Sequence, residues 1–299
     1  MKTQLVLLGA TLCTVLSCSA NPSDSGSRVG GSAASAGATN SFPGNGLGGG
    51  SNNIDTGSAN TGDAGLECSN ALDVTYRDFN EMHPDFEMPF PGDVVRRGLV
   101  SSTLGANRKP VFADRVGHPA LAGDPLAINT DWNPTEPVIQ SAATFDQWYN
   151  STAGVNQEFH KQLFLTESGT DAGIFGYESS AFFPLAPTEG FGITPKGNDQ
   201  GMNFLFTTEI HVLFTYHPLQ KFTFRGDDDL WIFINGKLAL DLGSMHNAEE
   251  GTIDFDAQAA ALGISPGTSY PMDVFHAERH TRASNFEVTT NIACFIPDI

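Results

Sequence analysis

Three successive carboxylates form the most distinctive feature of this 299-residue sequence. Asp227, Asp228 and Asp229 lie between an alternating apolar segment, residues 222–224, and a hydrophobic hairpin pattern, residues 231–240. Adjacent anions repel one another, so beside apolar strands they cost stability unless water or a cation neutralises them. Ca²⁺ accepts roughly six to eight oxygen ligands from carboxylates and carbonyls, which suits such a loop. A solvated acidic loop tip is the equally simple alternative.

A second set of potential ligands lies at His276, Glu278 and His280. Zinc hydrolases carry HExxH on a helix, whereas here the Glu stands at a different position. In a strand the three side chains share one face, where they could bind a metal or form a polar row across strands. No serine elbow, Cys–His pair or glycine-rich phosphate loop occurs in a supporting context. The sequence therefore predicts a protein that is not an enzyme.

The elements that must position these residues are mostly strands. Residues 203–216 alternate apolar and polar side chains, which predicts a half-buried strand, and residues 286–292 alternate in the same way. Residues 231–240 contain Asn-Gly between two apolar runs, which predicts a hairpin with a type I′ turn. Short helices capped by Thr or Asp are expected at residues 144–149 and 256–262. We expect an all-β fold with a few short helices.

The N-terminal fifth of the sequence, residues 1–66, has a different character. Residues 1–18 combine one positive charge with a short apolar run, which indicates an export signal too short to span a bilayer. The run ends in Val-Leu-Ser-Cys and resembles the lipobox of bacterial lipoproteins, which implies lipidation of Cys18 and outer-membrane sorting. Ordinary cleavage near Ala20 is the alternative. Residues 19–66, rich in Gly, Ser and Asn, are expected to form a disordered tether spanning roughly 35–40 Å.

Residues 67–299 are aromatic-rich and are expected to fold as one domain. They retain two cysteines, Cys68 and Cys294, and export favours a disulfide between them over two free thiols. Such a bridge would close a loop of 294 − 68 = 226 residues and add about 5 kcal/mol in the entropic model. The net charge of −19 excludes nucleic acid as a partner and suits divalent cations.

The sequence resembles the fibro-slime domain, a branch of the protective-antigen-type modules of surface and adhesion proteins. The resemblance covers residues 72–292 and implies a protective-antigen-like antiparallel β-sandwich or barrel with a few short helices. The matching blocks are residues 76–79, 83–87, 182–185, 206–211, 226–236 and 275–281.

In the sugar-binding adhesins of this wider fold, two Asp residues joined by a cis peptide hold Ca²⁺, and the sugar completes the coordination. The motif places that pair at Asp227 and Asp228, and the loop at residues 281–285 offers Asn285 as a further ligand. Asp229 is an additional metal candidate without a matching position.

The remaining ligand-binding candidates are His246, also without a matching position, and Trp132, which could stack on a sugar or anchor its loop over the core. The resemblance implies a non-enzymatic cell-surface module that binds a glycan or matrix polymer with Ca²⁺. A structural slime component without a ligand is the alternative, and a metal-dependent hydrolase is a more distant one.

Overall fold

The computed structural model describes residues 67–89, 94–119, 135–195 and 201–298. These residues belong to one compact unit, Ala59–Ile299. Its strands are β1 Ala71–Phe79, β2 Arg96–Arg97, β3 His118–Pro119, β4 Asn156–Phe164, β5 Thr166–Glu167, β6 Phe175–Ser179, β7 Phe206–Thr215, β8 Lys221–Gly226, β9 Asp229–Ile234, β10 Lys237–Leu242, β11 Glu249–Asp254, β12 Ser269–Glu278, β13 Phe286–Thr290 and β14 Ile296–Pro297, and its helices are α1 Ala142–Tyr149 and α2 Phe255–Leu262.

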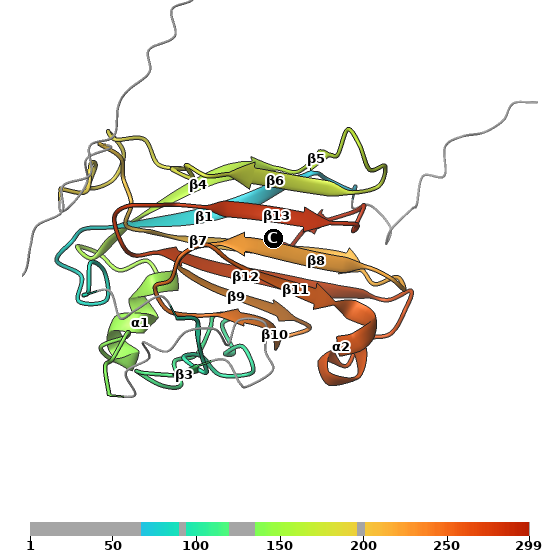
Figure 1. Ribbon diagram of the computed structural model, residues 1–299, viewed down its shortest axis with the longest axis horizontal. Helices are drawn as coiled ribbons and strands as arrows, with labels where there is room; N and C mark the ends of the chain where they lie inside the picture. The colour runs from blue at the N-terminus through green and yellow to red at the C-terminus, as the bar shows by residue number, and fades with distance from the viewer. Residues whose placement is uncertain (1–66, 90–93, 120–134, 196–200, 299) are drawn as a thin grey trace, which may run out of the picture. The chain divides into compact units, whose positions relative to one another are not determined.

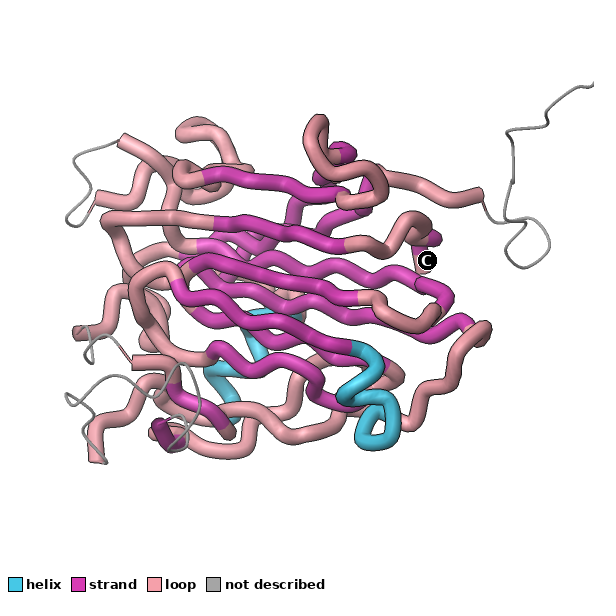
Figure 2. The backbone as a smooth tube through the Cα atoms, turned by 45° about the vertical axis from the view of Figure 1, so that its right-hand side comes forward, coloured by secondary structure: helices cyan, strands magenta, loops and turns pink. Residues whose placement is uncertain are grey.

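Two antiparallel sheets pack face to face as a sandwich (Figures 1 and 2). The larger sheet has the order β10-β9-β12-β7-β1-β4, with β14 also paired to β7, and the smaller sheet has the order β11-β8-β13-β6-β5. Strands β8 and β9 follow each other in sequence but belong to different sheets. The acidic residues between them therefore lie where the chain crosses from one sheet to the other. The expected all-β sandwich is confirmed.

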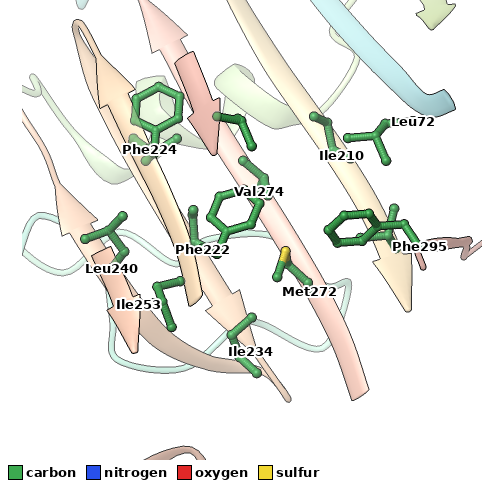
Figure 3. Packing of buried hydrophobic residues seen from close by; sticks show 14 of the residues in the cluster. Leu72, Ile210, Phe222, Phe224, Ile234, Leu240, Ile253, Met272, Val274 and Phe295 are labelled. Carbon is green, nitrogen blue, oxygen red and sulfur yellow. The ribbon is translucent and has the colours of Figure 1, made fainter. Parts of the chain in front are cut away.

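The core between the sheets contains alternate residues of both. Phe222 and Phe224 of β8 face Met272 and Val274 of β12 (Figure 3), and all four are at most 5% exposed. Because side chains of a strand alternate between its two faces, the intervening residues of β12 point to the opposite side of the larger sheet.

A second core covers that opposite side. Trp231 and Phe233 of β9 pack there with Phe275 of β12 against the aromatic side chains of α1. Strand β9 is consequently buried on both faces. The half-buried pattern expected for residues 203–216 is wrong for the first part of β7, where all five residues from Phe206 to Ile210 are buried. Thr207 satisfies its hydroxyl there by donating to the Trp148 carbonyl at 2.7 Å.

The predicted turn and both predicted helices are present, and each helix begins one or two residues earlier than expected. Asn235 and Gly236 both have positive φ, 53° and 72°, as a type I′ turn requires. Helix α1 begins earlier than expected because Ser141, and not Thr, is the N-cap, and Thr144 closes a capping box with it. Helix α2 is capped by Asp254, whose carboxylate accepts from the Ala257 N–H at 3.1 Å.

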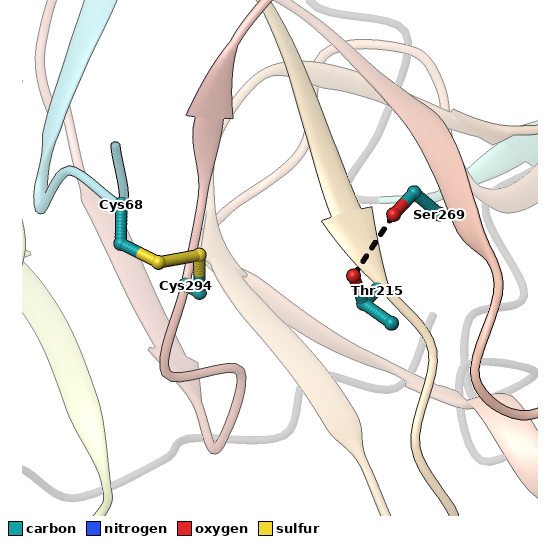
Figure 4. Close-up of a disulfide and its surroundings, with 4 residues drawn as sticks. All are labelled: Cys68, Thr215, Ser269 and Cys294. Atoms are coloured by element: carbon teal, nitrogen blue, oxygen red, sulfur yellow. Dashed lines mark hydrogen bonds between the residues drawn. A yellow bond between two sulfur atoms is a disulfide. The ribbon is translucent and has the colours of Figure 1, made fainter. Parts of the chain in front are cut away.

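The predicted disulfide is present. Cys68 and Cys294 are bonded, with Cα atoms 4.9 Å apart, and join the chain just before β1 to the chain just before β14 (Figure 4). Cys18 and Trp132 lie outside the described residues. Neither helix in the described ranges has the length and hydropathy that a bilayer-spanning segment needs.

Candidate functional site

The acidic run occupies the short crossover between the sheets. Gly226 ends β8, Asp227 and Asp228 form the connection, and Asp229 begins β9. The peptide bond between Asp227 and Asp228 is cis, as the family resemblance implied. A Cβ on Gly226 would lie 2.5 Å from the Asn285 carbonyl oxygen, so glycine allows the loop before β13 to approach this connection closely.

Asp227 is tied to that neighbouring loop through one residue. Its Oδ1 accepts from the Asn285 backbone N–H and its Oδ2 accepts from the Asn285 side-chain Nδ2, both at 2.6 Å. Burial raises the pKa of Asp227, while the hydrogen bonds from Asn285 oppose the shift. The two residues that the resemblance paired as ligands are therefore brought together.

Asp228 is also buried, at 6% exposure, and accepts from the Arg279 backbone N–H at 3.0 Å. Burial raises its pKa well above the ordinary value; the positive charge of Arg279 opposes this, and Asp227 and Asp229 add to it. The ionised form of this carboxyl is thus costly in the protein alone, and a bound cation would stabilise it.

Asp229 has a different environment. Its Oδ2 accepts from Arg279 Nε at 2.6 Å in a pair whose side chains are both fully buried, and its Oδ1 accepts from the Ser244 N–H at 2.6 Å. Sequence reasoning missed Arg279, although an Arg next to buried strand residues is a sign of an internal ion pair. Its Nη1 also donates to the carbonyls of Asp85 and Val138, and its guanidinium lies 4.7 Å from the centre of the Trp148 ring.

A cavity of about 400 Å³ opens beside the first two carboxylates. The described residues that line it are Asp227, Asp228, His246, Asn247, His280, Arg282 and Ala283. His246 is thus placed at the cavity, where its Nδ1 lies 2.7 Å from the Asn247 carbonyl. Asp229 is not among the lining residues.

The three residues at positions 276, 278 and 280 do not form one ligand set. His276 is fully buried, and its Nε2 lies 2.8 Å from the Asp227 carbonyl, which can only accept, so Nε2 carries the proton. Burial lowers its pKa to about 4, so the ring is neutral at pH 7. His280 lines the cavity instead.

Glu278 is buried at 1% exposure, and neither carboxyl oxygen has a hydrogen-bond partner among the described residues. Burial, with the nearby charges of Asp228 and Asp227, raises its pKa well above the ordinary value. The Ser284 side chain and the His280 backbone oppose this increase, but neither has the geometry of a normal hydrogen bond to the Glu278 carboxyl group.

His211 belongs to a structural charge network. Its Nδ1 and Nε2 lie 2.6 Å from carboxylate oxygens of Asp273 and Glu209. Glu209 also accepts from Arg77 Nη1 at 2.6 Å and from Lys109. Burial alone would raise the pKa of Glu209, but these partners lower it to about 2.

The oxygens at the cavity fit a hard cation such as Ca²⁺. Asp227 and Asp228 supply adjacent buried carboxylates, and the Asn285 amide could present Oδ1 after a half-turn that exchanges it with Nδ2. Within the described ranges no three His, Cys, Asp or Glu side chains converge as a metal cluster. A cation would therefore need carbonyl, water or ligand oxygens to complete its coordination.

Comparison with known proteins finds relatives that the chain matches over only part of their length. No protein-family model matches the chain. The chain is similar to Protein psiC of Dictyostelium discoideum, 36% identical over 214 residues that cover 70% of this chain and 38% of that protein. Protein psiD of the same organism is 35% identical over 225 residues, covering 74% and 41%. Across the first relatives the chain spans about 20–41% of their length. These relatives give no specific support to the prediction that the chain is a bacterial lipoprotein.

Two solved structures show a weaker likeness. The PA14 sugar-binding domain from an RTX adhesin matches with a TM-score of 0.21 and 13% identity, over 33% of this chain and 55% of that one. The PA14 domain of MpAFP antifreeze protein matches with a TM-score of 0.25 and 11% identity, over 40% and 65%. Similarity at this level carries no argument about the site.

Proposed function

We propose that this chain is a non-enzymatic, adhesin-like cell-surface module that binds a glycan or matrix polymer through Ca²⁺ held at Asp227 and Asp228. The observation that carries the proposal is the pair of adjacent, buried carboxylates at a cavity of about 400 Å³. A cation there would be bound on one side by protein oxygens and would leave its other side open to a ligand in the cavity. The fibro-slime resemblance of residues 72–292 supports the same role.

The proposed location is the outer surface of a cell. Lipidation of Cys18 would attach the chain to an outer membrane, and residues 19–66 would hold the folded unit away from it. Incorporation of a labelled fatty acid into the full chain, abolished in C18S, is the expected result. Equal labelling of C18S would contradict the lipid anchor.

A structural matrix component is the second candidate. It is favoured by the internal bonds of the site, since Asn285 holds Asp227 and the Arg279 N–H holds Asp228. Here Ca²⁺ would stabilise the crossover loop and no ligand would enter the cavity. A metal-dependent hydrolase has less support, because the ring of His276 faces a backbone carbonyl.

Glycan-array binding in Ca²⁺ and in EDTA tests the proposal. The wild-type chain should be retained in Ca²⁺ and released by EDTA, and D228N should not be retained in either. D171N is the matched control, because Asp171 is an exposed aspartate between β5 and β6. A melting temperature that falls in EDTA, with no glycan retained in Ca²⁺, would favour the structural candidate and overturn ligand binding.

A further inference from the structure

The cavity beside Asp227 and Asp228 carries a positive group as well as carboxylates. Arg282 lines it and is an exposed residue. The imidazoles of His246 and His280 also line the cavity. Basic side chains are scarce in this protein, with 15 Lys and Arg against 34 Asp and Glu. A basic residue at the candidate binding cavity therefore stands out from the rest of the chain.

The described charged groups at the cavity become net positive when a divalent cation is bound. With a divalent cation bound and both aspartates ionised, the cation, Asp227, Asp228 and Arg282 sum to +2 − 2 + 1 = +1. The protein as a whole has a net charge of −19. The cation-loaded cavity would thus be a local positive site on an acidic protein, which favours a small anionic group and disfavours general polyanion binding.

The described lining contains few apolar residues. Ala283 is the one apolar side chain among the described lining residues, and none of those residues is Phe, Tyr or Trp. Ligand pockets that rely on apolar contact are lined mainly by hydrophobic and aromatic side chains. The charged side chains at this cavity can therefore distinguish ligands of similar shape.

Resting on the proposed function, we infer that the glycan recognised at this site carries a carboxylate, as in a uronic acid. This carboxylate contacts both the bound cation and the guanidinium of Arg282. A carboxylate supplies hard oxygen ligands to Ca²⁺, and its planar pair of oxygens matches the two parallel N–H donors of a guanidinium. A neutral sugar can offer hydroxyl oxygens to the cation but no charge to Arg282. The charged sugar gains a second, charge-assisted contact that its neutral counterpart lacks.

Matched pairs of monosaccharides test this inference on the full chain. Galacturonate differs from galactose, and glucuronate from glucose, by a carboxylate in place of a hydroxymethyl group. With saturating CaCl₂, calorimetric or ligand-observed NMR titration should give at least about tenfold tighter binding of the acidic sugar in a pair, because hydrogen bonds to charged groups are the stronger class. Equal affinity for both members of each pair would overturn the inference while leaving Ca²⁺-dependent glycan binding in place.

Variants separate Arg282 from the cation. R282Q should lower the affinity for the acidic sugar by about tenfold, leave the affinity for the neutral sugar unchanged, and leave the calcium titration unchanged. K221Q removes an exposed charge at the opposite end of β8 and should match the wild type in all three measurements. If R282Q binds the acidic sugar as the wild type does, Arg282 is not the recognising residue. If the wild type does not bind Ca²⁺, the proposed function itself fails.

Discussion

Replacing Arg279 with methionine should destabilise the protein strongly, because it breaks a fully buried ion pair from one side. In R279M the Asp229 carboxylate loses its 2.6 Å partner, the carbonyls of Asp85 and Val138 lose donors, and Trp148 loses a stacked cation. Removing one partner of a buried pair costs about 3–5 kcal/mol, since a buried charge is left uncompensated. At about 2–4 °C per kcal/mol for a domain of this size, the melting temperature should fall by roughly 6–20 °C.

Urea denaturation monitored by tryptophan fluorescence measures this loss. R225M is the matched control: Arg225 is exposed on β8, so the free energy of unfolding should change by no more than about 0.5 kcal/mol. The double variant R279M/D229L removes both charges and should recover part of the stability lost in R279M. A loss below about 1 kcal/mol in R279M, or no recovery in the double variant, would refute the assignment of this pair as a structural element.

Three further predictions concern the surroundings of the site and the rest of the fold. G226A should weaken calcium binding measured by calorimetry, because its Cβ would press on the Asn285 carbonyl from 2.5 Å; unchanged affinity would show that the loop adapts. Replacing Cys68 and Cys294 together with serine should lower the free energy of unfolding by up to about 5 kcal/mol, and a loss under 1 kcal/mol would contradict the loop-closure estimate. The pKa of Glu209 is lowered from 4.5 to about 2, so the stabilisation that its carboxylate gives the fold is full above pH 4.5 and is lost as the pH falls toward 2. In E209Q the free energy of unfolding should therefore depend less on pH in this range. The same acid dependence in E209Q and in the wild type would refute the shift.

The sequence predicted those parts of the site that follow from local pattern or from motif. The Asn-Gly turn and the strand before Asp227 are local features, and the resemblance placed Asp227, Asp228 and Asn285 together. The structure contains the cis Asp227–Asp228 peptide and two hydrogen bonds from Asn285 to Asp227, and cation binding there stays a prediction.

The other features of the site and fold depend on tertiary packing, which a local sequence pattern does not reveal. Thr207 is buried against Trp148 of α1, and Glu209 is buried where it pairs with Arg77 of β1 and with Lys109, which alternation within one strand cannot reveal. Asp229 differs from its two neighbours because it pairs with Arg279, which directly follows β12 and lies 50 positions further along the chain. The three adjacent aspartates therefore have two different environments, which their spacing alone could not distinguish.

Calorimetric titration of the chain with Ca²⁺ tests the central claim most directly. The account predicts saturable binding at one site per chain, lost in D228N and retained in D171N, with a melting temperature that falls when EDTA is added to the wild type. No heat of binding in the wild type, together with the same melting temperature in Ca²⁺ and in EDTA, would contradict a cation site at Asp227 and Asp228.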